Sequence, residues 1–211
     1  MINITNEDNM ELMSRYEDNY FDLAIVDPPY GIEKHGQEET FTKKKDHKRK
    51  YYKQKKWDIA IPKKEYFDEL KRVSKNQVIW GANYFVEFLN KGTMGWVFWY
   101  KGQEGLTMSD GEIAFTSFQK ATRQININRR FISKNGGSIH PTQKPVKLYE
   151  WLLMNYAKQG DKILDTHLGS GSIAIACHNL GFDLTACELD KEYYEAATKR
   201  IKEHQSQLRI I

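Results

Sequence analysis

A short apolar run that stops at two prolines constrains the fold of this chain most strongly. Residues 23–26 (LAIV) have no polar alternation, which is typical of a strand buried on both faces of a parallel sheet. Pro28 and Pro29 have no amide hydrogen, so strand pairing has to end there. Asp27 and Tyr30 are therefore expected at the carboxyl end of a buried strand, where open α/β sheets bind their ligands. A plain strand-ending turn, with Asp27 as the turn former, is the alternative interpretation.

The length of 211 residues predicts a single domain, residues 1–211, with room for a sizeable core and a small insertion. No run approaches the roughly 18 apolar residues of a membrane span, and the polar N-terminus does not resemble a signal peptide. Cys177 and Cys187 lie among apolar residues, as in a reduced intracellular protein. We therefore expect a cytoplasmic protein with no membrane partner.

Positive charge is concentrated in residues 43–56 (KKKDHKRKYYKQKK), where one acid stands among nine Lys and Arg residues, although the net charge of the chain is only +4. A solvated loop is the simple interpretation of such a run. A long loop inside a compact domain is uncommon unless it has a function, and aromatic residues are interleaved with these lysines. Residues 31–62 are therefore also interpreted as a mobile nucleic-acid-binding flap, with basic groups on phosphates and rings stacked on bases. The contacts expected from it are Lys43, Lys44, Lys45, Lys48, Arg49, Lys50 and Tyr51.

Apolar runs and helical periodicity alternate along the chain and predict an α/β fold. Residues 119–139 are basic and are expected to be irregular and exposed. With the loop at residues 101–109 they belong to a short target-recognition region, residues 101–139, whose expected DNA contacts are Arg123, Arg129 and Arg130. Seven strands are expected, at residues 1–5, 23–26, 78–80, 96–99, 113–115, 163–165 and 184–187. Helices are expected from Asn6 or Asp8 to residue 16 and at residues 63–73, 84–89, 146–157, 172–180 and 191–205.

Residues 162–188 form a complete β-loop-α-β unit with glycines at positions 169 and 171. The glycines allow a sharp turn and a close approach to a ligand, and Glu188 follows where nucleotide-binding folds hold ribose hydroxyls. The loop lacks Gly-Lys-Ser/Thr and is not Gly-x-Gly-x-x-Gly. Asp165 at the strand end would repel a pyrophosphate but suits a ligand with an ammonium group, such as S-adenosylmethionine. A purely structural glycine-rich turn is the alternative.

Three motifs together resemble those of S-adenosylmethionine-dependent DNA amino-methyltransferases. Asp27-Pro28-Pro29-Tyr30 resembles the catalytic motif, residues 165–172 (DTHLGSGS) resemble the cofactor loop, and residues 140–145 (HPTQKP) resemble the motif that precedes it. The catalytic motif comes first, which is the order of the family's β group, and residues 80–85 and 109–115 look like those of small, phage-type members. The resemblance implies a Rossmann-like methyltransferase fold, with a seven-stranded, mostly parallel sheet, helices on both faces and a circularly permuted motif order. Thr166-His167 departs from the Pro-Phe of many relatives, although phage-type members carry the same pair.

The resemblance also implies a role for each site residue. Asp27 and the carbonyl of Pro28 would accept hydrogen bonds from a target amine, while Tyr30 would stack on a base flipped out of the duplex. Pro29 would hold the backbone rigid. Asp at position 27 resembles the adenine-N6 members, since Ser is commoner there in cytosine-N4 members. The cofactor-binding residues expected are Asp27, His140, Thr142, Asp165, Thr166, His167, Gly169, Ser170, Gly171, Ser172, Glu188 and Leu189, with a local turn role as the alternative for His140 and no metal expected.

The function expected from these residues is methylation of adenine N6 in double-stranded DNA, with S-adenosylmethionine as the cofactor. Restriction-modification, phage defence and regulation are equally compatible roles. Methylation of cytosine N4, methylation of RNA adenine and a catalytically inactive nucleic-acid-binding subunit are the alternatives. The retained Asp27 and loop glycines disfavour an inactive subunit, and Asp165 with the missing third glycine disfavours an NAD enzyme. Because residues 101–139 are few for reading a DNA sequence, either specificity is loose or a second subunit, such as a homodimer partner, shares the recognition.

Overall fold

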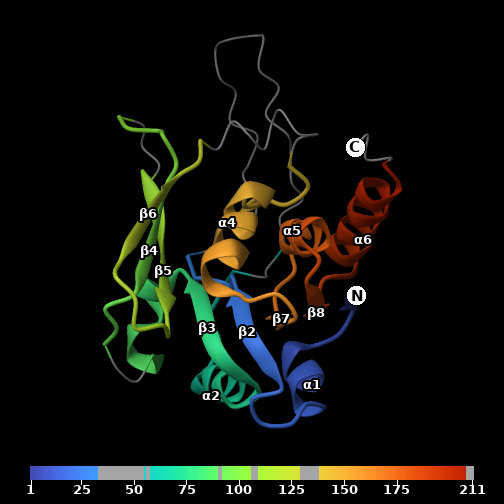
Figure 1. Ribbon diagram of the computed structural model, residues 1–211, viewed down its shortest axis with the longest axis horizontal. Helices are drawn as coiled ribbons and strands as arrows, with labels where there is room; N and C mark the ends of the chain where they lie inside the picture. The colour runs from blue at the N-terminus through green and yellow to red at the C-terminus, as the bar shows by residue number, and fades with distance from the viewer. Residues whose placement is uncertain (33–54, 56–57, 90–91, 106–108, 129–137, 208–211) are drawn as a thin grey trace.

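A single sheet runs through the computed structural model, which describes residues 1–32, 55, 58–89, 92–105, 109–128 and 138–207. The strands of this described part are β1 (Ile2–Thr5), β2 (Phe21–Val26), β3 (Ser74–Trp80), β4 (Trp96–Tyr100), β5 (Gly111–Thr116), β6 (Arg123–Asn126), β7 (Lys162–Asp165) and β8 (Asp183–Cys187). They form an eight-stranded sheet in the order β1-β8-β7-β2-β3-β5-β4-β6 (Figure 1). Among these strands β5 is antiparallel to its neighbours β3 and β4, and the other pairs are parallel. The predicted α/β fold with a mostly parallel sheet is confirmed.

Strand β6 corrects the prediction of seven strands and of an irregular segment at residues 119–139. It pairs in parallel with β4, from Val97 opposite Arg123 to Tyr100 opposite Asn126. Of its residues only Ile125 is buried, and the other three are exposed. A four-residue edge strand with a single buried side chain leaves no periodic signal in the sequence, which is why it was missed.

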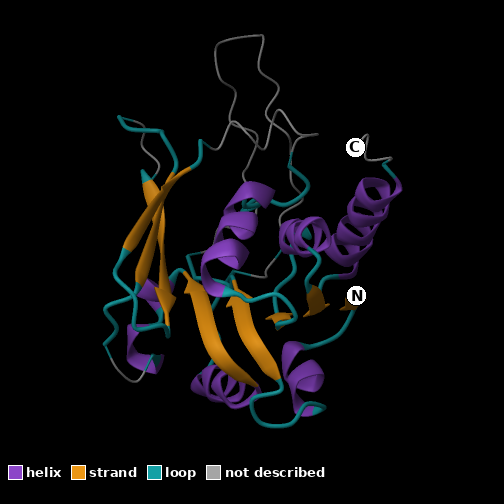
Figure 2. Ribbon diagram, in the orientation of Figure 1, coloured by secondary structure: helices purple, strands orange, loops and turns teal. Residues whose placement is uncertain are grey.

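Helices cover both faces of the sheet, as predicted (Figures 1 and 2). In the part of the chain that the structure describes, no helix has the length and apolar character needed to span a membrane. On one face lie α1 (Asn9–Ser14) and α2 (Lys64–Val73), and on the other lie α4 (Val146–Tyr156), α5 (Ser172–Leu180) and α6 (Lys191–Ser206).

Strand β2 supplies side chains to the core on both of its faces, which explains its unbroken apolar sequence. Leu23 and Ile25 pack in the core that contains α4 and α5, whereas Ala24 and Val26 pack in the core that contains α1 and α2. All four side chains are at most 1% exposed. Burying a Leu, Ile or Val side chain stabilises a fold by about 1.5–3 kcal/mol relative to leaving it in water. A polar substitution in this strand would therefore disturb one of the two cores.

Two local predictions differ from the structure between α2 and β4. The helix predicted at residues 84–89 is wrong, because the chain makes two 3₁₀ turns there, η1 (Ala82–Tyr84) and η2 (Val86–Phe88). Phe85 interrupts them with a non-helical φ of −122°, and its buried ring packs 5.2 Å from that of Phe67. Strand β3 also begins at Ser74, directly after α2, rather than at residue 78. Tertiary packing overrides local propensity at both points.

Strands β2 and β7 are neighbours in the middle of the sheet, with Leu23 opposite Ile163 and Ala24 opposite Leu164. The Asp-Pro-Pro-Tyr motif and the glycine loop therefore follow adjacent strands of the sheet. Most of the predicted flap, residues 33–54 and 56–57, lies outside the described residues, and so do Arg129 and Arg130. All the flap contacts named above from Lys43 to Tyr51 are within that range, so their role stays a prediction. Arg123 is described and is exposed on β6.

Candidate active site

The described residues line a cavity of about 960 Å³ at the carboxyl ends of β2, β7 and β8, and a cavity of about 310 Å³ at the carboxyl ends of β2 and β3. Four residues line both of them and so mark where they meet: Asp27, Pro29, Thr142 and Lys144. The larger cavity extends over the glycine loop, and the smaller one extends toward β5 and the η1 turn. The sequence motif that ends β2 thus lies at the junction of two adjoining spaces.

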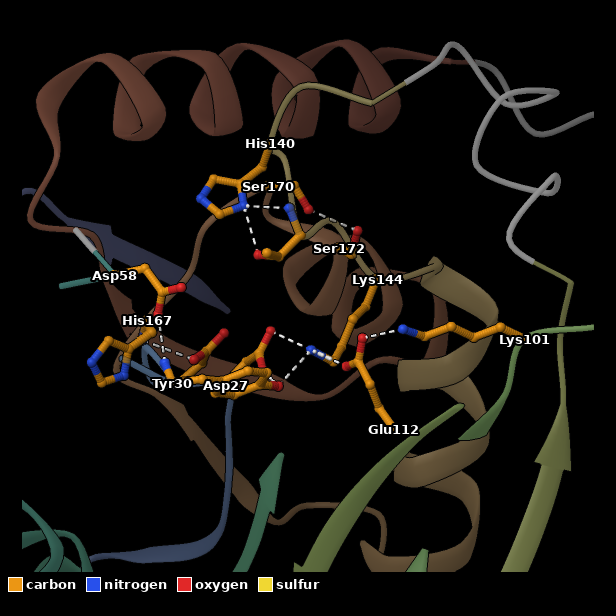
Figure 3. Close-up of polar contacts among 12 residues, drawn as sticks. Asp27, Tyr30, Asp58, Lys101, Glu112, His140, Lys144, His167, Ser170 and Ser172 are labelled. Carbon is orange, nitrogen blue, oxygen red and sulfur yellow. Dashed lines mark hydrogen bonds and ion pairs between the residues drawn. The ribbon is translucent and has the colours of Figure 1, made fainter. Parts of the chain in front are cut away.

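Asp27 is held in the junction by contacts to both of its carboxylate oxygens. The Tyr30 hydroxyl donates to Oδ1 at 2.5 Å, and the Lys144 ammonium donates to Oδ2 (Figure 3). Burial raises the pKa of the Asp27 carboxyl, and the neighbouring Lys144 ammonium opposes that rise. Asp27 is therefore an acid whose charge depends on a nearby cation.

Lys144 lies between two carboxylates, although its side chain is only 2% exposed. Its Nζ is 3.0 Å from Glu112 Oε2, and Lys101 Nζ lies 2.5 Å from Glu112 Oε1. Burial disfavours the ammonium, but Asp27 and Glu112 outweigh that effect and raise the pKa of Lys144. Burial likewise disfavours an ionised Glu112, yet the two lysines lower its pKa to about 2. Asp27, Lys144, Glu112 and Lys101 form a line of alternating charges (Figure 3).

The backbone that follows the two prolines is fixed by Asp58. Its Oδ1 accepts hydrogen bonds from the backbone amides of Tyr30 at 2.7 Å and Gly31 at 2.9 Å. The Tyr30 ring stacks on that of Tyr84, with centroids 5.1 Å apart and planes 14° from parallel. Both rings line the smaller cavity, so that cavity has an aromatic wall, and Asp58 holds the backbone that carries the Tyr30 ring.

The larger cavity is bounded by the glycine loop and the end of β8. Glu188 holds this loop, because its Oε2 accepts from the Gly169 amide at 2.8 Å and its Oε1 accepts from the Asp190 amide at 3.0 Å. Burial raises the pKa of Glu188, which the two amide hydrogen bonds oppose. Gly169 has a φ of +53°, a left-handed conformation that glycine adopts without strain. The predicted pairing of a glycine loop with a strand-end acid is present in the fold.

Most of the predicted cofactor residues line the larger cavity, but three do not. Asp165 is 2% exposed and lies behind the cavity wall, where its Oδ1 accepts from the His167 amide at 3.0 Å. Burial raises the pKa of Asp165 to about 8. Gly171 and Ser172 also lie outside the lining. The residues of the predicted set that do line it are Asp27, His140, Thr142, Thr166, His167, Gly169, Ser170, Glu188 and Leu189.

His140 is both a local turn residue and part of the cavity wall. Its Nδ1 lies 3.1 Å from Thr142 Oγ1, and its ring meets that of Tyr193 edge-on at 4.4 Å. Burial lowers the pKa of His140 to about 3, and burial does the same for His167. Both rings are therefore neutral near pH 7, and neither supplies a positive charge to the cavity.

Sequence reasoning missed several residues that shape the two cavities. Lys144 belongs to the HPTQKP motif and Glu112 to the segment at residues 109–115, but charged residues near turns are normally exposed. Tyr66, from α2, was also missed, and its hydroxyl lies 2.7 Å from Thr166 Oγ1. Lys55 belongs to the basic run, yet it pairs with Asp190 at 2.5 Å and Glu192 at 2.8 Å beside the larger cavity. For Lys144 and Glu112, the only signal in the sequence is that each lies within a segment that resembles a family motif.

A match to a family model identifies the class of this protein. Residues 37–199 match the family described as DNA methylase, so the chain belongs to the DNA methylase family. The family predicted from the motifs is confirmed.

Individual relatives and solved structures agree with this family. The chain is 39% identical over 62 residues to the type II methyltransferase M.HpaI of Haemophilus parainfluenzae, a match that covers 29% of this chain and 20% of that protein. The M1.HpyAVI–SAM complex superposes with a TM-score of 0.64 at 22% identity, over 95% of this chain and 100% of that one. PvuII DNA methyltransferase, described as cytosine-N4-specific, gives 0.60 at 14% identity, over 100% of this chain and 88% of that one. These structural likenesses establish the shared fold.

Proposed function

We propose that this protein transfers a methyl group from S-adenosylmethionine to the N6 amine of adenine in DNA. The proposal is supported mainly by the meeting of the two cavities at Asp27. A methyl donor and its acceptor have to be held in contact, and two cavities that meet allow this. The match to M.HpaI spans about a fifth of that relative, so the support for this activity comes from the site and not from the match.

The larger cavity fits S-adenosylmethionine in size and in chemistry. About 960 Å³ lies at the upper end of the volumes of cofactor pockets. Glu188, at the end of β8, is placed to accept ribose hydroxyls. When bound, the cofactor supplies an electrophilic methyl group on a sulfonium. The structural neighbour M1.HpyAVI is described as a complex with this compound, which supports the assignment.

The smaller cavity suits a flipped base. Tyr30 and Tyr84 provide flat apolar rings at its wall, and Asp27 with the carbonyl of Pro28 lies where it opens toward the larger cavity. An exocyclic amine is a weak nucleophile because its lone pair is delocalised into the ring. Acceptors on the two amine hydrogens would hold it in line and would stabilise the positive charge that develops on nitrogen.

Adenine is proposed rather than cytosine because of Asp27, which resembles the adenine-N6 members. The fold does not discriminate, since the PvuII neighbour is described as cytosine-N4-specific. We further propose that the basic residues from Lys43 to Lys50 bind the DNA backbone and that the enzyme acts in the cytoplasm. A homodimer partner or second subunit would complete the reading of the sequence around the target base.

Product analysis tests this function. Purified protein, S-adenosylmethionine with a labelled methyl group and double-stranded DNA of mixed sequence should yield labelled N6-methyladenine after hydrolysis to nucleosides. Asp27→Ala should lose transfer by about 10³-fold or more, because it removes an acceptor from the reacting amine. Label in N4-methylcytosine would contradict the proposal, and so would label in RNA but not in DNA when the two are supplied in parallel reactions. Near-normal single-turnover transfer by Asp27→Ala would contradict the role of Asp27.

A further inference from the structure

Lys144 is a buried cation at the one place where the two cavities meet. Its side chain is 2% exposed, and its ammonium donates to Asp27 and lies 3.0 Å from Glu112. It also lies 5.8 Å from the centroid of the Tyr30 ring and 5.4 Å from that of Trp80. Removing an ammonium from water is costly, so a lysine is found there only if its surroundings hold the charge.

We propose that Lys144 is a positioning residue that keeps Asp27 ionised and oriented toward the target amine, with Glu112 as its second anchor. The expected effect of Lys144 on catalysis rests on the proposed function, whereas its effect on the charge of Asp27 does not. As a carboxylate, Asp27 offers both oxygens as acceptors and a full negative charge to the amine. A protonated acid would instead donate to its neighbours and would not stabilise positive charge on nitrogen.

The groups around Asp27 come from several elements, and they differ in their effect on its charge. Glu112 on β5 is an ionised acid whose negative charge raises the pKa of Asp27. Asp165 at the end of β7 is also an acid, but burial raises its own pKa to about 8, so it is mostly protonated near pH 7. Tyr149 on α4 and Tyr66 on α2 are buried phenols, and burial together with the charge of Asp27 raises the pKa of each. The Tyr30 hydroxyl donates one hydrogen bond.

Among the described residues, Lys144 is the one cation within ion-pair distance of Asp27. Lys101 reaches Glu112 and not Asp27, so it steadies the far anchor. The chain thus places a single positive charge against an acid that burial and the negative charge of Glu112 would otherwise neutralise. Glu112 holds that charge from the side of the smaller cavity, which fixes the direction in which the Lys144 side chain extends.

The first test measures the ionisation of Asp27 without cofactor or DNA. Protein labelled with carboxyl-¹³C aspartate is examined by NMR at pH 7, and the Asp27 signal is assigned by its loss in Asp27→Asn. Asp27 should be ionised in the unsubstituted protein and in Lys144→Arg, which keeps the charge, but protonated in Lys144→Met. Lys147→Met removes an exposed lysine from the next helix and should leave the Asp27 signal unchanged. An ionised Asp27 in Lys144→Met would overturn the proposal.

The second test follows methyl transfer against pH. In Lys144→Met the single-turnover rate at pH 7 should fall at least tenfold and should then recover by about tenfold per pH unit as Asp27 ionises. Lys144→Arg should restore part of the rate at pH 7. A loss that is the same at every pH would show a merely structural role and would overturn the inference.

A third variant guards against misfolding. Lys144→Met leaves Asp27 and Glu112 without their shared partner, whereas Lys144→Met with Glu112→Gln removes one charge of each sign. Asp27 should still be protonated at pH 7 in this double variant, and ionised in Glu112→Gln alone, where Lys144 remains. The opposite pattern would refute the role of Lys144. If the protein methylated no DNA, the proposed function would fail, while the NMR result would still decide whether Lys144 holds the charge of Asp27.

Discussion

At the scale of single residues, the position of the Tyr30 ring depends on having no side chain at residue 81. Gly81 has a φ of +67°, and a Cβ built there would overlap the Tyr30 ring. The stack of Tyr30 on Tyr84 therefore requires glycine at the start of the η1 turn. A flat wall of the smaller cavity is in this way specified by one missing side chain.

Gly81→Ala should displace the Tyr30 ring and reduce methyl transfer by about 10- to 100-fold, because a small misplacement near the reacting groups is costly. Left-handed backbone at an alanine costs about 1–2 kcal/mol in addition. Gly160→Ala is the matched control, since Gly160 has a φ of +91° and open space around it. Both variants should lose unfolding free energy in urea, Gly81→Ala at least as much as Gly160→Ala, but only Gly81→Ala should lose single-turnover rate. Equal rates in the two variants would contradict the role of Gly81.

At the scale of elements, helix α6 braces the glycine loop that precedes helix α5. Arg200 Nη1 donates to the Ser170 carbonyl at 2.7 Å and to Ser172 Oγ at 3.0 Å. Burial of this side chain lowers the pKa of Arg200. Ser170 lines the larger cavity, so a helix remote in sequence fixes part of its wall.

Arg200→Met should weaken the binding of S-adenosylmethionine by about tenfold or more, since a hydrogen bond from a charged donor contributes about 1.5–3 kcal/mol. Isothermal titration calorimetry measures the affinity, with Lys199→Met as the control because that neighbouring side chain is 78% exposed. Unchanged affinity in Arg200→Met would mean that the loop keeps its shape without α6.

The helices and strands are the part of the structure that the sequence predicted best, and the wrongly predicted elements have a common cause. β2, α2 and the unit from β7 to β8 follow apolar patterns that a local reading detects. β6 and the 3₁₀ turns around Phe85 depend on neighbours distant in sequence, on β4 for the strand and on Phe67 for the ring. A local pattern contains no information about such partners.

At the scale of the whole molecule, burial of neutral histidines should make the protein sensitive to acid. Burial lowers the pKa of His167 to about 3, below the ordinary value of 6.5 that the unfolded chain would show. The unfolded state then binds one proton more than the folded state between these values. Stability contributed by the neutral ring is thus present above the unfolded pKa and lost as the pH falls below it. His140, whose pKa burial also lowers to about 3, acts in the same direction.

His167→Gln removes one of the two histidines that take up a proton when the protein unfolds in acid. The difference in unfolding free energy between the unsubstituted protein and His167→Gln should shrink by about 1.4 kcal/mol per pH unit as the pH falls from 6 to 4. Urea denaturation at several pH values measures this difference, in which the contributions of other groups cancel. Curves that stay parallel across this range would contradict a neutral, buried His167.

The sequence by itself determined the class of the fold and most of its elements, and it placed the two main motifs at the ends of buried strands. Apolar runs, the Pro28-Pro29 stop and the glycines of the loop act locally, so their consequences can be read along the chain. Only the tertiary structure decided which charges meet at Asp27. Lys144 lies 117 residues from it in sequence, and a charge is buried or solvated according to contacts of that range. Asp165 illustrates the same limit, because its place behind the cavity wall, and its raised pKa of about 8, depend on packing rather than on its motif.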